Sequence, residues 1–178
     1  MGRRQKIRGF RSVIAVIFIL VACIASGDES SNKLKTESYF YKVDPNSVNL
    51  KHSCSVYVPA YSHIYLSKDH LASLGVTLSI RNVDSSRKLY ITQVEYYDTQ
   101  GTLTDMLTAG LFALAPMATI SYVIDQQDMR GGVGANFIVR WAAENPIHPP
   151  IIEAIMAGNA GTKGYSFSSR GENISCND

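Results

Sequence analysis

Apolar and polar residues alternate along most of the chain after residue 54. Residues 76–81 place Val76, Leu78 and Ile80 on one side of an extended segment, and residues 137–141 do the same with Phe137, Val139 and Trp141. A period of two is typical of a strand with one buried face. The pattern recurs in short segments separated by turn signals, and it predicts strands at 54–66, 75–84, 88–98, 114–125, 135–141, 151–157 and 165–170.

Three further segments are less regular. Residues 39–43 predict a first edge strand, and residues 69–75 admit one helical turn. Residues 104–115 resemble a helix in composition, but Gly110 and the following Pro116 weaken that interpretation. In the segment 88–98, strict alternation places Tyr90, Thr92, Val94 and Tyr96 on one side. The fold class expected from these patterns is all-β, an immunoglobulin-like or fibronectin-like β-sandwich of about seven to nine strands.

The N-terminal segment has a different pattern. Residues 1–11 are basic, and Val13–Ala25 is an uncharged apolar run of about 13 residues, shorter than the roughly 20 that span a bilayer. A basic start, a short apolar core and small residues after it predict a secretory signal peptide. The alternative is a short membrane anchor that is retained.

The end of the apolar run reads Leu20-Val21-Ala22-Cys23. It resembles the lipobox of bacterial lipoproteins, in which the cysteine is lipidated and the signal is cut before it. The resemblance implies that residues 1–22 are removed and that Cys23 carries the lipid that anchors the chain to a membrane. Because Ile24 is not an aspartate, it implies the periplasmic side of the outer membrane in a Gram-negative host. Cleavage after Ala25 or Gly27, giving a soluble secreted protein, remains the alternative.

Charge is distributed unevenly along the sequence. Five of the 17 basic residues lie within residues 1–11, so 12 basic and 15 acidic residues remain, a net charge of −3. The sequence after residue 11 has no stripe of basic residues of the kind that indicates a nucleic-acid partner. The polar segment from residue 28 to about 53 predicts a tether, so the expected organisation is a signal peptide (1–22), a lipidated start with tether (23–53) and a sandwich domain (54–178).

The chain contains three cysteines. If Cys23 carries lipid, Cys54 and Cys176 remain, one at each end of the predicted domain. In an oxidising compartment they are able to form a disulfide, and two unpaired thiols too far apart to bond are the open alternative.

Several phrases resemble one bacterial family: "VYVPAYSHIY", "LSIRNVD", "LYITQVEYYDTQG", "LAPMAT", "GGVGANFIVRW", "PIIEAIM" and "SFSSRG". It is known as domain of unknown function 3124 and occurs in exported bacterial proteins, many with lipoprotein signals. The resemblance covers about residues 54–171. It implies an envelope domain and no particular activity. The motif residues to which it assigns no role are Gly131, Gly132, Gly134, Asn136, Phe137, Trp141 and Arg170.

The glycine-rich phrase invites comparison with phosphate-binding loops. "GGVGA" lacks their Lys-Ser/Thr ending and leads into a strand rather than a helix. We therefore expect Gly131, Gly132 and Gly134 to provide a positive φ or a close backbone approach. A weak anion nest of backbone amides beside Arg130 is the alternative.

Other chemistry has little support in the sequence. The four histidines (His52, His63, His70 and His148) form no metal motif, and no GxSxG elbow exists around Ser168 or Ser169. Asp98 is expected to be a turn residue, whereas an acid/base pair or calcium loop drawn from Glu95, Asp98 and Asp105 is the alternative. Trp141 and Tyr96 are expected to be buried, which leaves Tyr97 as the better surface contact.

Together these patterns favour a lipid-anchored protein of the bacterial cell envelope whose β-sandwich has a structural role or binds a protein or glycan partner. It is expected to be non-enzymatic, with no metal and no cofactor. The alternative is an enzyme or metal-dependent site, for example a hydrolase, built from loops at one end of the sandwich. Convergence of Arg130, Asn136 and Arg170 in one pocket would distinguish the alternative.

Overall fold

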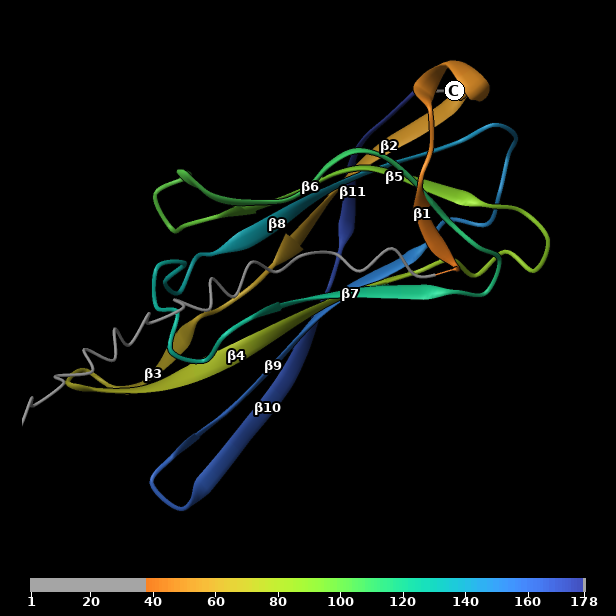
Figure 1. The fold of residues 1–178 in the computed structure, drawn as a ribbon. Helices are drawn as coiled ribbons and strands as arrows, with labels where there is room; N and C mark the ends of the chain where they lie inside the picture. Colours follow the sequence, from red (N-terminus) through yellow and green to blue (C-terminus); the bar gives the residue numbers. More distant parts are fainter. Residues whose placement is uncertain (1–37, 178) are drawn as a thin grey trace, which may run out of the picture. The chain divides into compact units, whose positions relative to one another are not determined.

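The computed structural model describes residues 38–177, which form two antiparallel sheets (Figure 1). The six-stranded sheet has the order β1-β6-β5-β8-β2-β11, and the other has the order β10-β9-β4-β3, with β7 also paired to β4. The strands are β1 (Phe40–Lys42), β2 (His52–Pro59), β3 (His63–Ser67), β4 (His70–Arg81), β5 (Leu89–Tyr97), β6 (Leu103–Leu114), β7 (Thr119–Ile124), β8 (Asn136–Ala143), β9 (Ile151–Ala160), β10 (Lys163–Arg170) and β11 (Glu172–Asn177). The predicted all-β sandwich is confirmed, with eleven strands rather than seven to nine.

The core lies between the two sheets. From the five-stranded sheet, Val76, Leu78 and Ile80 of β4 are fully buried, as their alternation predicts. Phe137 and Val139 of β8 meet them from the other sheet, and Tyr96 packs on Phe137 with ring centroids 4.9 Å apart. Apolar burial on this scale supplies the main driving force of folding.

Strand β5 does not follow the strict alternation expected of it. Its register against both neighbours shifts between Ile91 and Gln93, so Thr92 is an extra residue of a β-bulge. Leu89 and Ile91 therefore face the core, as do Val94 and Tyr96 beyond the bulge. The prediction that Tyr90 and Tyr96 share a face is wrong, because the bulge changes the phase of the strand between them.

Tyr90 belongs to a second, smaller apolar cluster. It is buried together with Leu111 and Ala113, and Tyr41 of β1 packs against the three of them together with Val43, Val48 and Leu50 from the segment that follows. β1 itself pairs with β6, so Phe40–Lys42, which precede residue 54, already belong to the six-stranded sheet. The predicted strand at 39–43 is present, and the stretch 40–53 assigned to the tether is part of the domain because its apolar residues cover this cluster.

Two segments with helical features are strands. Residues 70–75 belong to β4, where pairing with β3 and β9 satisfies the backbone; the helical turn suggested at 69–75 is wrong. Residues 103–114 form β6, and Gly110 takes a φ of +115° at the irregular part of its pairing with β5. The only helical element among residues 38–177 is a 3-10 turn at Pro45–Ser47, which Asp44 caps by accepting from the Asn46 amide at 3.0 Å.

The final strand is joined covalently to the second. Cys176 lies directly opposite Cys54 in the pairing of β11 with β2, and their sulfurs form a disulfide. The Cα atoms are 4.1 Å apart. This bond closes a loop with a sequence separation of 122 residues and fixes an edge strand whose six residues are all exposed.

The predicted signal peptide, Cys23 and the tether up to residue 37 lie outside the described residues. Within 38–177, no helix is both long enough and apolar enough to cross a bilayer.

We expect replacement of both Cys54 and Cys176 by serine to lower the free energy of unfolding by about 4–5 kcal/mol on the loop-entropy model. The sandwich should still fold, because β2 remains paired with β8. Urea unfolding of both proteins, with and without reductant, measures the difference. Equal midpoints for the oxidised parent and the double variant would contradict a stabilising role for the bond.

Candidate functional site

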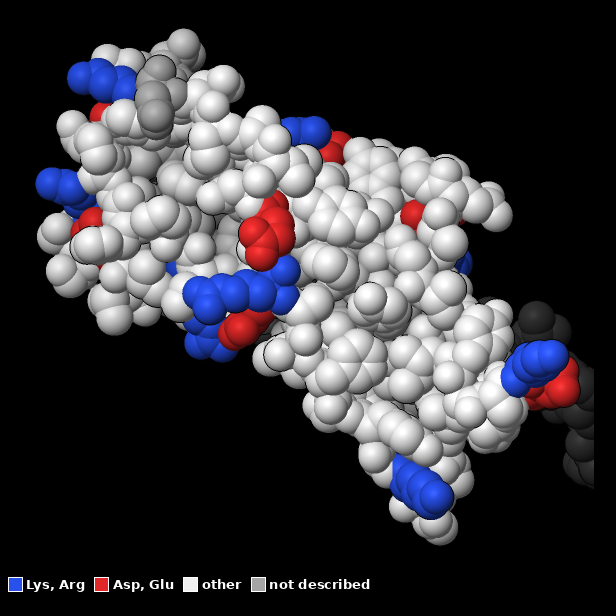
Figure 2. Space-filling view, turned by 180° about the vertical axis from the view of Figure 1, so that it is seen from behind, with Lys and Arg blue, Asp and Glu red and all other residues white. Residues whose placement is uncertain are grey.

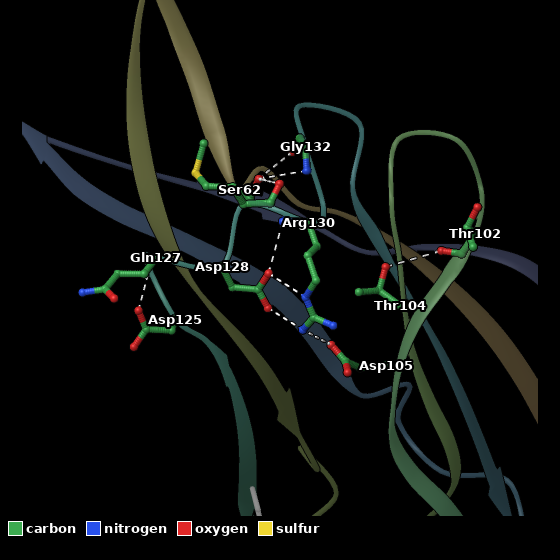
Figure 3. A network of polar contacts seen from close by, with 10 residues as sticks. Ser62, Thr102, Thr104, Asp105, Asp125, Gln127, Asp128, Arg130 and Gly132 are labelled. Carbon is green, nitrogen blue, oxygen red and sulfur yellow. Dashed lines mark hydrogen bonds and ion pairs between the residues drawn. The ribbon is translucent and has the colours of Figure 1, made fainter. Parts of the chain in front are cut away.

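The glycine-rich turn before β8 is held by two other loops, and Figure 3 shows its contact with one of them, at Ser62. The Gly132 amide donates to Ser62 Oγ at 2.8 Å, and the Ser62 amide donates back to the Gly132 carbonyl at 3.0 Å. On the other side, the Gly134 amide donates to Thr99 Oγ1 at 2.9 Å, while the Thr99 amide and hydroxyl both donate to the Gly131 carbonyl. The turn therefore holds the β2–β3 and β5–β6 connections together. We call this group of residues the clasp: Ser62, Thr99, Gly131, Gly132 and Gly134.

The glycines are needed for steric reasons. A Cβ at Gly131 would lie 1.9 Å from the Tyr96 hydroxyl and 2.8 Å from the Ala135 Cβ. Gly132 has a φ of +76°, which side chains disfavour. Tyr96 is fully buried with its hydroxyl unpartnered, and burial raises its pKa to about 12. The close backbone approach expected from the sequence is thus found at Gly131, and the positive φ is found at Gly132.

Arg130 is engaged by two carboxylates next to this turn (Figure 3). Its Nη2 lies 2.6 Å from Asp128 Oδ2 and 2.8 Å from Asp105 Oδ2, and its Nε donates to Asp128 Oδ1. These bonds raise the pKa of Arg130 and lower that of Asp128. An anion nest would need free backbone amides and a free positive charge. The Gly132 and Gly134 amides are already bonded and Arg130 is already paired, so the geometry favours a structural role for this turn.

Substituting Gly131 with alanine should lower the free energy of unfolding by about 1–3 kcal/mol, because the added methyl group overpacks a buried site. Gly164→Ala is the matched control, since its Cβ would meet nothing closer than 4.0 Å. Thermal or urea unfolding checks both variants. If Gly131→Ala is as stable as Gly164→Ala, the close approach to Tyr96 does not constrain the turn.

The outer face of the six-stranded sheet carries a regular polar and aromatic surface. Three rows of paired residues run across β2, β8 and β5, and we call them the outer grid: Ser55, Arg140 and Gln93; Tyr57, Ile138 and Glu95; Pro59, Asn136 and Tyr97. Asn136 and Tyr97, both singled out from the sequence, thus lie in one row of this surface.

A charged network lies within the outer grid. Arg140 Nη1 donates to Glu95 Oε2 at 2.7 Å and to Gln93 Oε1 at 2.6 Å, and Gln93 Nε2 donates to Glu95 Oε1 at 2.8 Å. Glu95 is buried, whereas Arg140 is partly exposed. Burial and the nearby Glu95 raise the pKa of the Tyr97 hydroxyl. Tyr57, in the neighbouring row of the grid, is 36% exposed. Sequence reasoning missed Arg140, Glu95 and Tyr57 as a group, although all three occupy polar-face positions of predicted strands.

Residues of β2, β8 and β11, together with the β8–β9 connection, form a recess on the other side of the same sheet. We call it the Trp141 recess, and its volume is about 600 Å³. It is lined by His52, Cys54, Trp141, Pro146, Ile147, Pro149, Asn173 and Cys176. Trp141 is buried, as predicted, and its Nε1 has no hydrogen-bond partner.

The remaining candidates do not assemble into one site. Arg130 lines a hollow with residues 98–100, Gly131 and Gly132, and neither Asn136 nor Arg170 is among the residues around it. Arg170 is exposed at the end of β10, and Ser169 donates to the Pro59 carbonyl. Among residues 38–177, no group of three or more histidine, cysteine or carboxylate side chains is arranged to hold a metal ion.

The carboxylates considered together in the sequence have separate partners. Asp98 Oδ1 accepts from the amides of Gln100 and Thr102, both at 2.8 Å, as a turn residue does. Asp105 pairs with Arg130 and Glu95 with Arg140. Figure 2 shows that on the face it presents, acidic and basic side chains mostly lie beside one another, separated by wide uncharged areas.

Comparison with known proteins identifies the family. The family model described as "Protein of unknown function (DUF3124)" matches residues 53–174. The chain belongs to this family. The match covers the outer grid, the clasp and most of the Trp141 recess.

No curated protein matches the sequence. Among solved structures, the chain is similar to one titled "Crystal Structure of Thermotoga maritima 1070", at 9% sequence identity and a TM-score of 0.41. The match covers 67% of this chain and 92% of the other.

Proposed function

We propose that this family member is an exported protein of the bacterial cell envelope, anchored by lipid at Cys23, whose β-sandwich binds a protein or glycan partner through the outer grid. The observation that carries the binding role is the grid itself. It combines Tyr57, Tyr97 and Arg140 on one sheet face, and these residue types are enriched at the energetic centres of interfaces.

The disulfide supports the proposed location. Bonds of this kind persist in oxidising compartments outside the cytoplasm. Cys54 and Cys176 are bonded to each other, which leaves Cys23 as the one cysteine available for lipid. The basic start, the short apolar run and the sequence Leu20-Val21-Ala22-Cys23 support the same proposal.

The state of the polar side chains favours binding over catalysis. Arg130 is held by ion pairs with Asp128 and Asp105, and Arg140 neutralises the buried Glu95. Convergence of Arg130, Asn136 and Arg170 in one concavity would favour a loop-built hydrolase, but Asn136 lies in the outer grid and Arg130 lines a hollow beside the glycine-rich turn.

The anchor is tested with Cys23→Ala. Cells expressing the parent protein and supplied with radiolabelled palmitate should yield a labelled protein in the membrane fraction. The variant should lose the label and accumulate as a larger precursor, because the cleavage that follows lipidation requires the cysteine. Cys54→Ser is the matched control and should keep the label. An unlabelled parent protein that still sediments with membranes would refute lipidation.

The binding face is tested by placing the photoreactive residue benzoylphenylalanine at Tyr97 in intact cells. Illumination should give a discrete crosslinked product, and Arg140→Ala in the same chain should reduce its yield several-fold. Val123 is the control position, because it is 59% exposed on a strand of the other sheet. The same products from both positions, or products from Val123 alone, would contradict binding through the outer grid.

A further inference from the structure

The Trp141 recess has the size and lining of a small-molecule site. Ligand pockets commonly have volumes of about 300–1,000 Å³ and are mostly apolar with a few polar groups. This recess, at about 600 Å³, is lined by the Trp141 indole, two prolines, Ile147 and the two disulfide cysteines. The two other lining residues, His52 and Asn173, are polar.

The charge of the lining restricts the ligand. No lysine, arginine, aspartate or glutamate is among the eight lining residues. Transfer of an ionised group into an apolar pocket without a counter-charge is unfavourable. The recess therefore fits an uncharged molecule.

The unpartnered indole nitrogen restricts the ligand further. Trp141 is 5% exposed, and its Nε1–H is buried without an acceptor. A buried donor left unsatisfied costs about 1–3 kcal/mol, which an acceptor on a ligand recovers. Because the indole donates only, the matching ligand atom is an oxygen or nitrogen with a lone pair.

The loop that forms one wall of the recess is rich in proline and does not pair with either sheet. It connects β8 to β9 and contains Pro146, Pro149 and Pro150, which have no amide to donate to a strand ladder. Arg87 donates to the Pro146 carbonyl and thereby ties the loop to the β4–β5 connection. The opposite wall is β11, which the disulfide fixes to β2. The recess thus lies between two tethered walls.

We propose that the Trp141 recess binds a small uncharged ring compound bearing a carbonyl or ether oxygen. The ring lies against Ile147 and the prolines, and the oxygen accepts a hydrogen bond from Trp141 Nε1–H after a slight shift of the covering loop. This site lies on the opposite side of β8 from the outer grid, so it goes beyond the proposed partner-binding role.

Trp141 is the single tryptophan of the chain, so one indole N–H cross-peak reports on the site. The experiment titrates the ¹⁵N-labelled, disulfide-bonded full chain with coumarin, a neutral fused ring with a lactone carbonyl. We expect the indole N–H signal to move downfield and to saturate with a dissociation constant of about 1 mM or lower, typical of a ligand of this size.

Two comparisons make the test specific. Coumarin-3-carboxylate, which adds a negative charge, should bind at least tenfold more weakly. Asn173→Arg should weaken coumarin binding at least tenfold by placing a long charged side chain at the recess. Ile174→Arg is the matched control and should bind as the parent does, because Ile174 is exposed and does not line the recess.

The proposal is overturned if the indole signal does not move with up to about 5 mM coumarin, or if Asn173→Arg binds as tightly as Ile174→Arg. Saturable binding without a downfield shift of the indole N–H would overturn the assigned hydrogen bond. The coumarin titration tests only the recess, whereas palmitate labelling and crosslinking at Tyr97 test the anchor and the outer grid. A negative result for one proposal therefore leaves the other standing.

Discussion

Exclusion of water from the space between the two sheets decides which side chains of each strand remain available for function. Successive side chains on a strand point to opposite faces, so burying Phe137, Val139 and Trp141 of β8 necessarily turns Asn136, Ile138 and Arg140 outward. β2 contributes Ser55 and Tyr57 to that outer side under the same constraint, because Val56 and Val58 are buried. The outer grid is thus a consequence of the core.

The clasp extends this constraint to the loops. Gly131 lies close to the hydroxyl of the buried Tyr96, Thr99 bonds the backbone of Gly131 and Gly134, and Ser62 bonds that of Gly132. The start of β8 is therefore fixed relative to the ends of β5 and β2. Since Asn136 and Tyr97 lie at these same strand ends, the clasp also positions the outer row of the grid. Its glycines serve binding indirectly, by fixing the backbone from which these side chains project.

The sequence carries information about faces more readily than about pairings. The alternation in β4 and β8 predicts their buried residues, because each pattern is local and uninterrupted. The bulge at Thr92 was not predictable in this way, since it is defined by the register of β5 against β6 and β8. The same applies to the clasp: Gly132 and Ser62 are 70 residues apart, Gly134 and Thr99 are 35 apart, and neither pair has a spacing motif. The disulfide between Cys54 and Cys176 likewise depends on the pairing of β2 with β11, which no local pattern in the sequence predicts.

Arg140 and Trp141 show how one strand carries two different chemistries. They are neighbours in the chain, yet Arg140 joins the charged network of the outer grid while Trp141 lines a mostly apolar recess whose lining contains no lysine, arginine, aspartate or glutamate. Their side chains project from opposite faces of the sheet, so the two surfaces have different polarities despite a separation of one residue. They are not mechanically independent, because both depend on the register of β8 against β2, and the disulfide that closes the recess also holds the outermost strand beside β2. A change that shifts β8 along its neighbours would move both surfaces at once. Substitutions confined to side chains, such as those at Asn173 and Tyr97, affect one surface and leave the other in place.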